Sequence, residues 1–339
     1  MSKNIITFPS DKNACGHYRN MIPMTYLSAK EKWNVTFLYQ FVYDLNLIKK
    51  TKAIMFQRQC TENQFDCILE YKNCILKIPE VNTKIVYELD DLVHAIEMYN
   101  SLAYQFYTPT KKNNVVNIMK MADRVTFSTN YLKNFYQQQF GINHSVVVPN
   151  YLPKFLWNPD FTKDKRTHSK KPTIIWAGSA SHIGKGGDLE FLFPMIKATL
   201  DEFHWKFIGV VPEDLKGKVE LVPWSDFMTY AHNMQNIKAD IALAPIKDSV
   251  FNRGKSDLKY LEYAAMNIPC ICSNLKSGPY DGTNCQNLIE NCPDSWYNCI
   301  KELLDNPNKY QSTLKAQQDY VSKRWLEDNW QIYDRVYSF

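Results

Sequence analysis

Short apolar runs alternate with stretches of helical periodicity along the whole chain. In the first half, strand-like runs cover residues 5–8, 35–39, 53–57, 84–87, 124–128 and 145–148. Helical patterns over residues 19–28, 62–78 and 114–121 separate most of these runs. In the second half, strand-like runs cover residues 173–177, 205–209, 219–222, 241–244 and 270–273. This alternation predicts an α/β protein with parallel sheets and crossover helices.

A polar segment divides the two series of strands. Residues 149–172 contain prolines and a charged run from Lys163 to Lys171, a composition typical of an exposed linker. The chain has 339 residues, which is more than one typical hydrophobic core. We therefore predict a first domain over residues 1–150, a linker over 151–172 and a second domain over 173–320. The stretch 321–339 has apolar residues at helical spacing, which predicts a helix returning toward the first domain.

Composition supports a globular protein and narrows its class. The hydrophobic share is 45%, the formal net charge is +5, and no apolar run approaches membrane-spanning length. No apolar signal region precedes the first strand, and the nine cysteines lack metal-type spacing. We expect reduced thiols and a cytoplasmic location. Two doubly wound, Rossmann-like domains would face a central cleft at the carboxyl ends of their strands, so ligand-binding residues are expected in those loops.

The clearest chemical signal lies in residues 252–273, whose pattern predicts a loop, a helix and a short buried strand. Lys255, Ser256 and Lys259 fall in or beside the first helical turn, where free N–H groups and the helix dipole favour phosphate. Glu262 follows one turn later and could accept hydrogen bonds from two ribose hydroxyls. The pattern suits a sugar nucleotide. An ordinary amphipathic helix with solvated lysines is the alternative.

Two loops of the first half place polar residues at predicted strand ends. After the first strand, Gly16 allows close backbone approach, and Arg19 in the following helical turn could clamp an acidic group. A plain loop with a surface arginine is the alternative. After a later strand, Asp90 and Asp91 could act as acid and base or bind a metal, and His94 follows closely. The alternative is that one aspartate caps the next helix.

Two loops of the second half offer further candidates. After its first strand, Gly178 and Ser179 begin a small-residue loop that continues through His182 and Lys185, an arrangement that can cradle phosphate. The loop matches neither a P-loop nor a dinucleotide fingerprint, and a flexible loop without a ligand is the alternative. Trp224 follows another strand and could either stack on a nucleobase or belong to the core.

In order along the chain, these loops resemble the GT-B glycosyltransferases of the retaining family 4 type. The resemblance covers essentially the whole chain. It rests on the segments "ACGHYR", "YELDD", "MADRVTFSTNYLKNFY", "VVVPNYL", "WAGSASH" and "GKSDLKYLEYAAMNIPCICS". The outline is most similar to that of small phage-encoded members.

The resemblance implies transfer of a sugar from a nucleoside diphosphate, UDP before GDP, to an acceptor hydroxyl with retention of configuration. It implies that Glu262 contacts the ribose and that Lys255 neutralises the diphosphate, with Lys185 and Lys259 as further candidates. The predicted catalytic residues are Asp90, Asp91, His94 and Lys255. The predicted donor-binding residues are Gly16, Arg19, Gly178, Ser179, His182, Lys185, Trp224, Lys255, Ser256, Lys259 and Glu262.

The chain departs from the family motif at one position. The first of the two motif glutamates falls on Gly254, and Asp248 is a candidate substitute. A non-catalytic nucleotide-binding protein with a decayed donor motif is therefore an alternative class. The resemblance implies no obligatory metal and no cofactor beyond the nucleotide sugar, because lysines and the helix dipole neutralise the leaving group.

The linker bears on the acceptor. Its positive charges suggest a polyanionic partner and lie at Lys163, Lys165, Arg166, Lys170 and Lys171. With the phage-like outline, they favour double-stranded DNA containing hydroxymethylcytosine, a base that would have to leave the duplex. Solvated surface lysines are the plain alternative. The competing acceptor is a saccharide or a lipid-linked sugar, with basic residues near anionic headgroups. No integral membrane association is expected.

Overall fold

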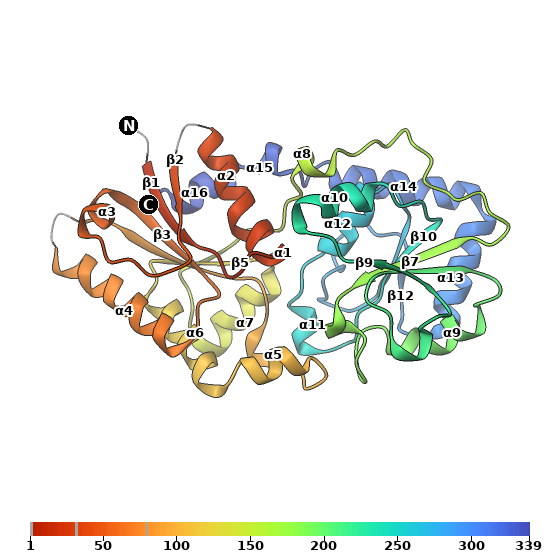
Figure 1. Ribbon diagram of the computed structural model, residues 1–339, viewed down its shortest axis with the longest axis horizontal. Coiled ribbons are helices and arrows are strands. Elements are labelled where there is room, and N and C mark those ends of the chain that lie inside the picture. Colours follow the sequence, from red (N-terminus) through yellow and green to blue (C-terminus); the bar gives the residue numbers. More distant parts are fainter. Residues whose placement is uncertain (1–2, 31–32, 79–80) are drawn as a thin grey trace.

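Two parallel six-stranded sheets, each covered by helices, form the two halves of the protein (Figure 1). The computed structural model describes residues 3–30, 33–78 and 81–339. The α/β architecture with two Rossmann-like domains predicted from the alternation of strands and helices is confirmed. No helix among the described residues is long and apolar enough to cross a membrane.

The first sheet has the strand order β2-β1-β3-β4-β5-β6. Its strands are β1 (Lys3–Phe8), β2 (Trp33–Phe37), β3 (Thr51–Gln57), β4 (Lys84–Leu89), β5 (Arg124–Phe127) and β6 (Ser145–Val147). Its helices are α1 (Ala14–Gly16), α2 (Ile22–Ala29), α3 (Leu45–Lys50), α4 (Glu62–Lys77), α5 (Ser101–Phe106), α6 (Pro109–Met121) and α7 (Asn130–Phe140).

Two predicted boundaries of the first half shift. The second strand begins at Trp33, two residues before the predicted start, because the buried Trp33 ring packs under α2 while β2 pairs with β1 at the sheet edge. The first helix begins at Ala14 rather than residue 19 and passes through a π-helical turn, η1 (His17–Met21), before α2. The loop after β1 is therefore shorter than predicted, and Gly16 and Arg19 both lie on helical turns.

The second sheet has the strand order β12-β11-β10-β7-β8-β9. Its strands are β7 (Thr173–Gly178), β8 (His204–Gly209), β9 (Glu220–Pro223), β10 (Ile241–Ala244), β11 (Cys270–Ser273) and β12 (Leu288–Ile289). Its helices are α9 (Phe193–Ala198), α10 (Phe227–Gln235), α11 (Val250–Arg253), α12 (Leu258–Ala265), α13 (Pro293–Asp305) and α14 (Pro307–Val321). The strands β7, β10 and β11 are buried at every position, as expected for a parallel sheet covered on both faces.

The segment predicted as an exposed linker is only partly exposed. Leu152 and Trp157 are fully buried, and Trp157 ends the short helix α8 (Lys154–Trp157), which packs against the second domain. The composition misled the prediction because the prolines and charges flank a few large apolar residues. The rest of the segment runs along the outside of the second domain (Figure 1).

The end of the chain returns to the first domain. Helices α15 (Leu326–Asn329) and α16 (Gln331–Tyr337) replace the single helix expected there, and Tyr333, Val336 and Tyr337 join the apolar cluster of the first sheet (Figure 1). Trp33 Nε1 donates a hydrogen bond to Asp334 Oδ1 at 2.8 Å. The chain thus passes between the domains at two adjacent places, near residues 150 and 324, and Leu152 pairs with Trp325 there.

Candidate functional site

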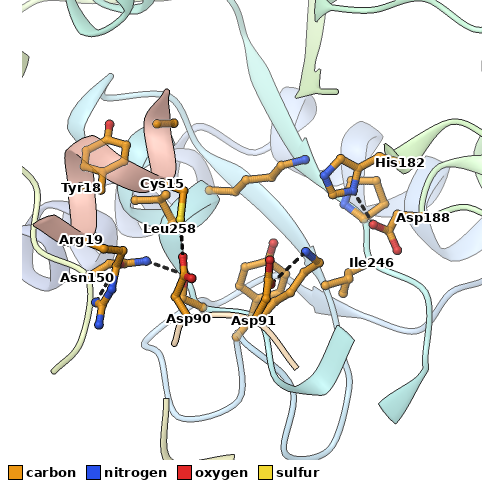
Figure 2. A pocket seen from close by; sticks show the side chains of 16 residues that line it. Cys15, Tyr18, Arg19, Asp90, Asp91, Asn150, His182, Asp188, Ile246 and Leu258 are labelled. Carbon is orange, nitrogen blue, oxygen red and sulfur yellow. Dashed lines mark hydrogen bonds and ion pairs between the residues drawn. The ribbon is translucent and has the colours of Figure 1, made fainter. Parts of the chain in front are cut away.

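A cavity of about 230 Å³ opens between the two domains at the carboxyl ends of their strands (Figure 2). Seven of the predicted site residues line it: Arg19, Asp90, Asp91, His182, Lys255, Ser256 and Lys259. The other lining residues are Ala14, Cys15, Tyr18, Asn150, Asp188, Pro245, Ile246, Leu258 and Tyr280. The roles of all these residues in binding stay predictions, but the structure brings residues from loops more than two hundred positions apart into one space.

The second domain gives the cavity a positively charged wall. Lys255 and Ser256 precede α12, and Lys259 lies in its first turn, so two ammonium groups lie beside the N-terminal end of the helix. Burial lowers the pKa of Lys259 to about 8. A buried ammonium group of this kind gains most from an incoming anion, because the anion replaces the solvation that burial removed.

The first domain gives the cavity an acidic wall. Asp90 and Asp91 follow β4, and the guanidinium of Arg58 holds both: Nε donates to Asp90 Oδ1, and Nη2 donates to Asp91 Oδ2 at 2.6 Å. Neither aspartate caps a helix through its side chain. Burial alone would raise the pKa of Asp91, but Lys255 and Arg58 outweigh burial and hold the pKa below its usual value. Both carboxylates are therefore fixed in position, and Asp91 is ionised near neutral pH.

The structure adds two residues that sequence reasoning missed. Arg58 has a φ of 58°, a left-handed backbone conformation that is uncommon outside glycine and that tends to occur at functional sites. The Cys15 thiol donates to Asp90 Oδ2 at 3.1 Å, and burial raises the pKa of this thiol well above its usual value, so the proton stays on sulfur. No sequence motif marks either residue, because each is defined by a partner more than thirty positions away.

Arg19 lines the cavity but has partners within the protein. Its guanidinium donates to Glu88 Oε1 at 2.8 Å, to the Val148 carbonyl at 2.7 Å and to Asn150 Oδ1 at 2.9 Å, and its side chain is 3% exposed. Burial raises the pKa of Glu88 to about 7, despite the opposing charge of Arg19. The acidic group that Arg19 clamps in this arrangement is thus Glu88, so Arg19 links the ends of β4 and β6, and a contact with phosphate stays a prediction.

Gly16 has a structural reason to be glycine. A Cβ atom at this position would lie 1.9 Å from the Asp11 carbonyl oxygen. Its N–H group donates to Asp11 Oδ1 at 3.2 Å and is not directed at the cavity. The close approach of the backbone predicted at this loop is present, but it serves the turn after β1.

Glu262 lies behind the cavity and is not among its lining residues. Its carboxylate accepts hydrogen bonds from Tyr18 Oη at 3.1 Å and from Tyr230 Oη at 3.2 Å. Trp157 Nε1 donates to Tyr18 Oη at 3.2 Å. Burial raises the pKa of Glu262 to about 7. Two hydroxyl groups of the protein thus occupy the carboxylate that was predicted to receive two ribose hydroxyls, and the Tyr18 hydroxyl comes from the first domain.

The loop after β7 contributes one residue to the cavity from each of its ends. His182 Nδ1 lies 2.5 Å from Asp188 Oδ2, and both side chains line the cavity opposite Arg19 and Asp90 (Figure 2). Gly178, Ser179 and Lys185 do not line it. Ser179 and Lys185 are exposed, and a Cβ atom at Gly178 would clash with the Trp176 ring at 2.3 Å.

His94 and Trp224 lie outside the cavity. His94 Nδ1 is 2.9 Å from Tyr136 Oη, and the ring also packs against Phe140. Burial, together with the charge of Lys112, lowers the pKa of His94 to about 4. The His94 ring points into the first domain and not into the cavity, so the structure gives no support to its predicted catalytic role. Trp224 is half exposed and lines a separate cavity of about 220 Å³ together with Tyr230.

The position of the missing motif glutamate leaves little room for a side chain. A Cβ atom at Gly254 would lie 3.0 Å from Leu92 Cβ of the first domain. Asp248, the candidate substitute, accepts hydrogen bonds from the Arg253 guanidinium on both carboxylate oxygens and does not line the cavity. In this arrangement Asp248 therefore does not take the place of the missing glutamate at the cavity.

Polar contacts join the domains across the cleft. Lys255 Nζ lies 3.6 Å from Asp91 Oδ1, and Asn150 Nδ2 donates to Ser256 Oγ at 2.7 Å. The hydrogen bond from Tyr18 to Glu262 also crosses the cleft, and so does an ion pair at 3.1 Å between Lys247 and Glu97. The described arrangement is therefore a closed one, in which the two walls of the cavity already touch.

The basic run of the linker lies at the opposite end of the second domain. The Lys165 carbonyl accepts a hydrogen bond from Ala239 N, and Thr167 N donates to Asp240 Oδ1, both just before β10 begins. These contacts place the run at the amino ends of the strands, whereas the cavity lies at their carboxyl ends. Lys163, Lys165, Arg166, Lys170 and Lys171 are not brought to the cleft.

Among residues 3–30, 33–78 and 81–339, no group of three or more His, Cys, Asp or Glu side chains is placed to hold a metal ion. The paired aspartates of the first domain have Arg58 between them, which occupies the place a cation would take.

No protein-family model matches the chain. In sequence, the chain is 27% identical over 209 residues to TuaH of Bacillus subtilis (strain 168), a protein assigned to teichuronic acid biosynthesis as a glycosyltransferase. The match covers 57% of this chain and 51% of TuaH, so the chain aligns with about half the length of this relative.

In structure, the chain is similar along its whole length to several solved proteins. Sucrose-phosphate synthase from Thermosynechococcus elongatus has a TM-score of 0.65 at 11% identity, covering 99% of both chains. Anabaena HepE in complex with UDP and glucose has a TM-score of 0.67 at 12% identity, covering 99% of both chains. An α-glucosyltransferase in complex with UDP-glucose and DNA containing an abasic site has a TM-score of 0.62 at 12% identity, covering 99% of this chain and 100% of the other.

These likenesses and the two facing sheets define the class of the fold. The protein has the GT-B fold, in which two Rossmann-like domains enclose a cleft. It resembles glycosyltransferases both in sequence and in fold, as the motifs predicted.

Proposed function

We propose that the protein is a glycosyltransferase that moves a sugar from a nucleoside diphosphate, UDP first, to an acceptor hydroxyl. One observation supports this most: the interdomain cavity has partly buried lysines at the start of α12 on one side and fixed carboxylates on the other. The first wall suits an anionic leaving group and the second suits a hydroxyl nucleophile. A purely structural interface would gain little from burying so many charges.

Lys255 stabilises the leaving group. When the bond between sugar and diphosphate breaks, negative charge grows on the phosphate oxygens, and preorganised positive groups lower the energy of that state. Lys255 is held close to the cavity by Asp91, and Lys259 adds a second charge from within the same helix turn. No metal is required, because the lysines supply the charge that a divalent cation would otherwise provide.

Asp91 orients the acceptor. Its carboxylate is fixed by Arg58 and is ionised near neutral pH, so it can accept a hydrogen bond from the attacking hydroxyl. In a transfer with retention, the leaving phosphate oxygen takes the hydroxyl proton as the new bond forms on the same face of the sugar. Asp91→Asn should then slow transfer about ten-fold while leaving nucleotide affinity unchanged, which steady-state kinetics and calorimetry would check.

A saccharide is the acceptor we favour. The relative in sequence is a glycosyltransferase of teichuronic acid biosynthesis, and the basic run that suggested DNA lies at the far end of the second domain. DNA containing hydroxymethylcytosine is the second candidate. It is favoured by the likeness to an α-glucosyltransferase in complex with DNA and by the resemblance to phage-encoded members.

The test begins with the donor alone. Purified protein is incubated with a panel of UDP- and GDP-sugars, and release of the nucleoside diphosphate is followed by mass spectrometry. Slow hydrolysis should occur with one donor, and Lys255→Ala should abolish it. The matched control Lys315→Ala changes a lysine of the same domain whose side chain is 72% exposed, and it should have no effect. If the wild type binds a donor but neither hydrolyses nor transfers its sugar, the protein is the non-catalytic nucleotide-binding relic. If it binds no donor, the proposal is wrong.

The acceptor is then identified with the active donor. Saccharide acceptors and duplex DNA with hydroxymethylcytosine are offered in parallel, and the product mass identifies the sugar added. Nuclear magnetic resonance of the new glycosidic bond reports whether the configuration is retained. A salt-sensitive shift of DNA in a gel, together with a mass gain on the modified base, would move the acceptor from saccharide to DNA.

A further inference from the structure

His182 and Asp188 form a hydrogen-bonded pair in the loop after β7, and both side chains line the cavity. The two side chains lie at opposite ends of the loop after β7, and His182 Nδ1 is 2.5 Å from Asp188 Oδ2. The His182 side chain is 18% exposed and that of Asp188 is 2% exposed. Both side chains line the cavity between the domains (Figure 2).

Asp188 cannot swing away from this position. Its second oxygen, Oδ1, accepts hydrogen bonds from Lys247 N at 2.9 Å and from Asn252 Nδ2 at 2.7 Å. Burial would raise the pKa of Asp188, but its contact with His182 and these other contacts hold the pKa below its usual value. The carboxylate is therefore ionised, and it fixes the proton of the neutral imidazole on Nδ1. Nε2 is then the ring nitrogen available to a ligand.

The charges around the ring explain why it is neutral in this arrangement. Burial, together with the nearby charges of Lys259 and Lys255 at the start of α12, lowers the pKa of His182 to about 4. Asp188 opposes them from the same loop. The other titratable groups that line the cavity are Cys15, Tyr18, Arg19, Asp90, Asp91 and Tyr280. The second domain thus places the charged ammonium groups of Lys255 and Lys259 and the neutral imidazole of His182 on the same wall of the cavity.

A diphosphate would reverse this balance. Bound beside Lys255 and Lys259, it would bring negative charge next to Nε2 and cancel the repulsion that the lysines exert on a charged ring. Other polar side chains of the loop are not placed for this contact, because Ser179 and Lys185 are exposed and do not line the cavity.

We propose that His182, held by Asp188, is the phosphate-binding residue of the loop after β7 and that it takes up a proton from solvent when a nucleoside diphosphate enters the cavity. This inference rests on the proposed function for the identity of the ligand. The proton goes to Nε2, the imidazolium donates a hydrogen bond to a phosphate oxygen, and Asp188 stays ionised and stabilises the new charge. Binding thereby adds a third positive group at the leaving group.

The experiment measures protons and affinity together. UDP is titrated by calorimetry into the wild type and into His182→Gln at pH 7.5, each in two buffers with different ionisation enthalpies. The dependence of the heat on the buffer gives the number of protons taken up. Proton changes of UDP itself and of Lys259 occur in both proteins and cancel in the comparison. The wild type should take up more protons than His182→Gln, by up to one per UDP, and bind about ten-fold more tightly.

Two further variants serve as a control for the histidine substitution and as a test of the role of Asp188. His204→Gln changes a half-exposed histidine that pairs with Glu220 on β9, away from the cavity, and should behave as the wild type. Asp188→Asn keeps the His182 ring but removes the charge that stabilises it, so proton uptake should fall while UDP still binds. Thermal unfolding of each variant checks that it is folded, and Asp188→Asn replaces His182→Gln if the latter is not.

The failures are distinguishable. If the wild type binds UDP with the same proton uptake as His182→Gln, the assignment of His182 is wrong and the proposed function stands. If affinity falls in His182→Gln with no change in proton uptake, the ring binds as a neutral group and the proposed protonation is wrong. If the wild type binds neither UDP nor GDP, the proposed function itself is wrong.

Discussion

Two basic regions of the second domain differ in almost everything except charge. Lys255 and Lys259 lie at the carboxyl ends of the strands, beside the start of α12, and face a cavity shared with the first domain. The run from Lys163 to Lys171 lies at the amino ends of the same sheet. There Arg166 forms hydrogen bonds with the Asp164 carboxylate, and Lys163 pairs with Asp160 at 3.3 Å in solvent.

The difference shows that the position of a charge in the fold matters more than its frequency in the sequence. The linker has more positive residues, but water and nearby aspartates already satisfy them, so they add little binding energy. The two lysines at α12 are fewer and partly desolvated, so a phosphate gains more from them. The predictions below test this contrast, from the largest expected effect to the smallest.

Within the linker itself, the apolar residues should matter more than the charges. Trp157→Ala should lower the free energy of unfolding by about 3–5 kcal/mol, because it removes a fully buried ring and its hydrogen bond to Tyr18. Denaturant unfolding followed by circular dichroism measures the change. Phe155→Ala, in the same helix but 59% exposed, is the control and should change stability by less than about 0.5 kcal/mol. Equal effects for both variants would contradict the buried role of Trp157.

At the cavity, Lys255→Ala should lower the turnover of donor hydrolysis or transfer by about 10²–10³-fold, the usual result of removing one group that stabilises charge in the transition state. Donor affinity should fall much less, because the charge on the phosphate grows as the bond breaks. Steady-state kinetics separates the two quantities. A turnover within about three-fold of the wild type would mean that Lys255 does not face the leaving group.

If the ribose of bound UDP displaces the hydroxyls of Tyr18 and Tyr230 from Glu262, Glu262→Ala should weaken UDP binding by about 1–3 kcal/mol, the cost of leaving ribose hydroxyls without their acceptor. Calorimetry measures the affinity, and Glu213→Gln, which changes a carboxylate with an 81% exposed side chain, is the control. An unchanged affinity in a folded Glu262→Ala protein would show that the tyrosine hydroxyls, rather than a ribose, are the permanent partners of this carboxylate.

The same residue predicts a pH effect on stability. Burial raises the pKa of Glu262 to about 7, so its favourable contribution to folding is full below the unfolded value and is lost as the pH rises through about 7. Glu262→Gln should therefore raise the free energy of unfolding at pH 8 by about 1–3 kcal/mol, with little gain at pH 5. Thermal unfolding at the two pH values measures the difference. A gain of equal size at both values would show that ionisation of the buried Glu262 does not cause it.

The smallest effect is expected from the basic run. Replacing Lys163, Lys165, Arg166, Lys170 and Lys171 together with Gln should leave donor hydrolysis within about two-fold of the wild type, because the run lies far from the cavity. If DNA is the acceptor, its affinity should fall, and the slope of log affinity against log salt should flatten by about 0.9 for each phosphate that the protein no longer neutralises. A strong decrease in hydrolysis would contradict the conclusion that these linker residues contribute little to the cavity.

Much of the fold could be predicted because parallel strands have a simple sequence signature. The run 270–273 becomes the buried strand β11, as the pattern indicated. The helix before it, α12, has Lys255 and Lys259 at its start, also as the pattern indicated. The predicted boundaries of β2 and of the exposed linker were wrong, because in each case one large buried side chain determines where the element begins or ends. The buried Trp33 is the first residue of β2, and the buried Trp157 belongs to the core although it lies in the predicted linker.

The site was harder to predict, because residue type does not reveal the partner. Arg19 looked like a phosphate clamp, but Glu88, from a strand about seventy residues later, neutralises it. Arg58, which holds both aspartates, lies in no recognisable motif. Such roles depend on which strand ends become neighbours, and local sequence carries no information on that pairing.

The return of α15 and α16 to the first domain has a consequence for how the chain matures. Tyr333, Val336 and Tyr337 fill part of the apolar cluster beneath β1 and β3, next to Met24 and Met55. During synthesis these side chains emerge only after the whole second domain has left the ribosome. The half that is made first therefore keeps an unfilled hydrophobic face until α16 has been synthesised, and its final packing waits for Tyr333, Val336 and Tyr337. The two halves are completed together, although they begin folding at different times.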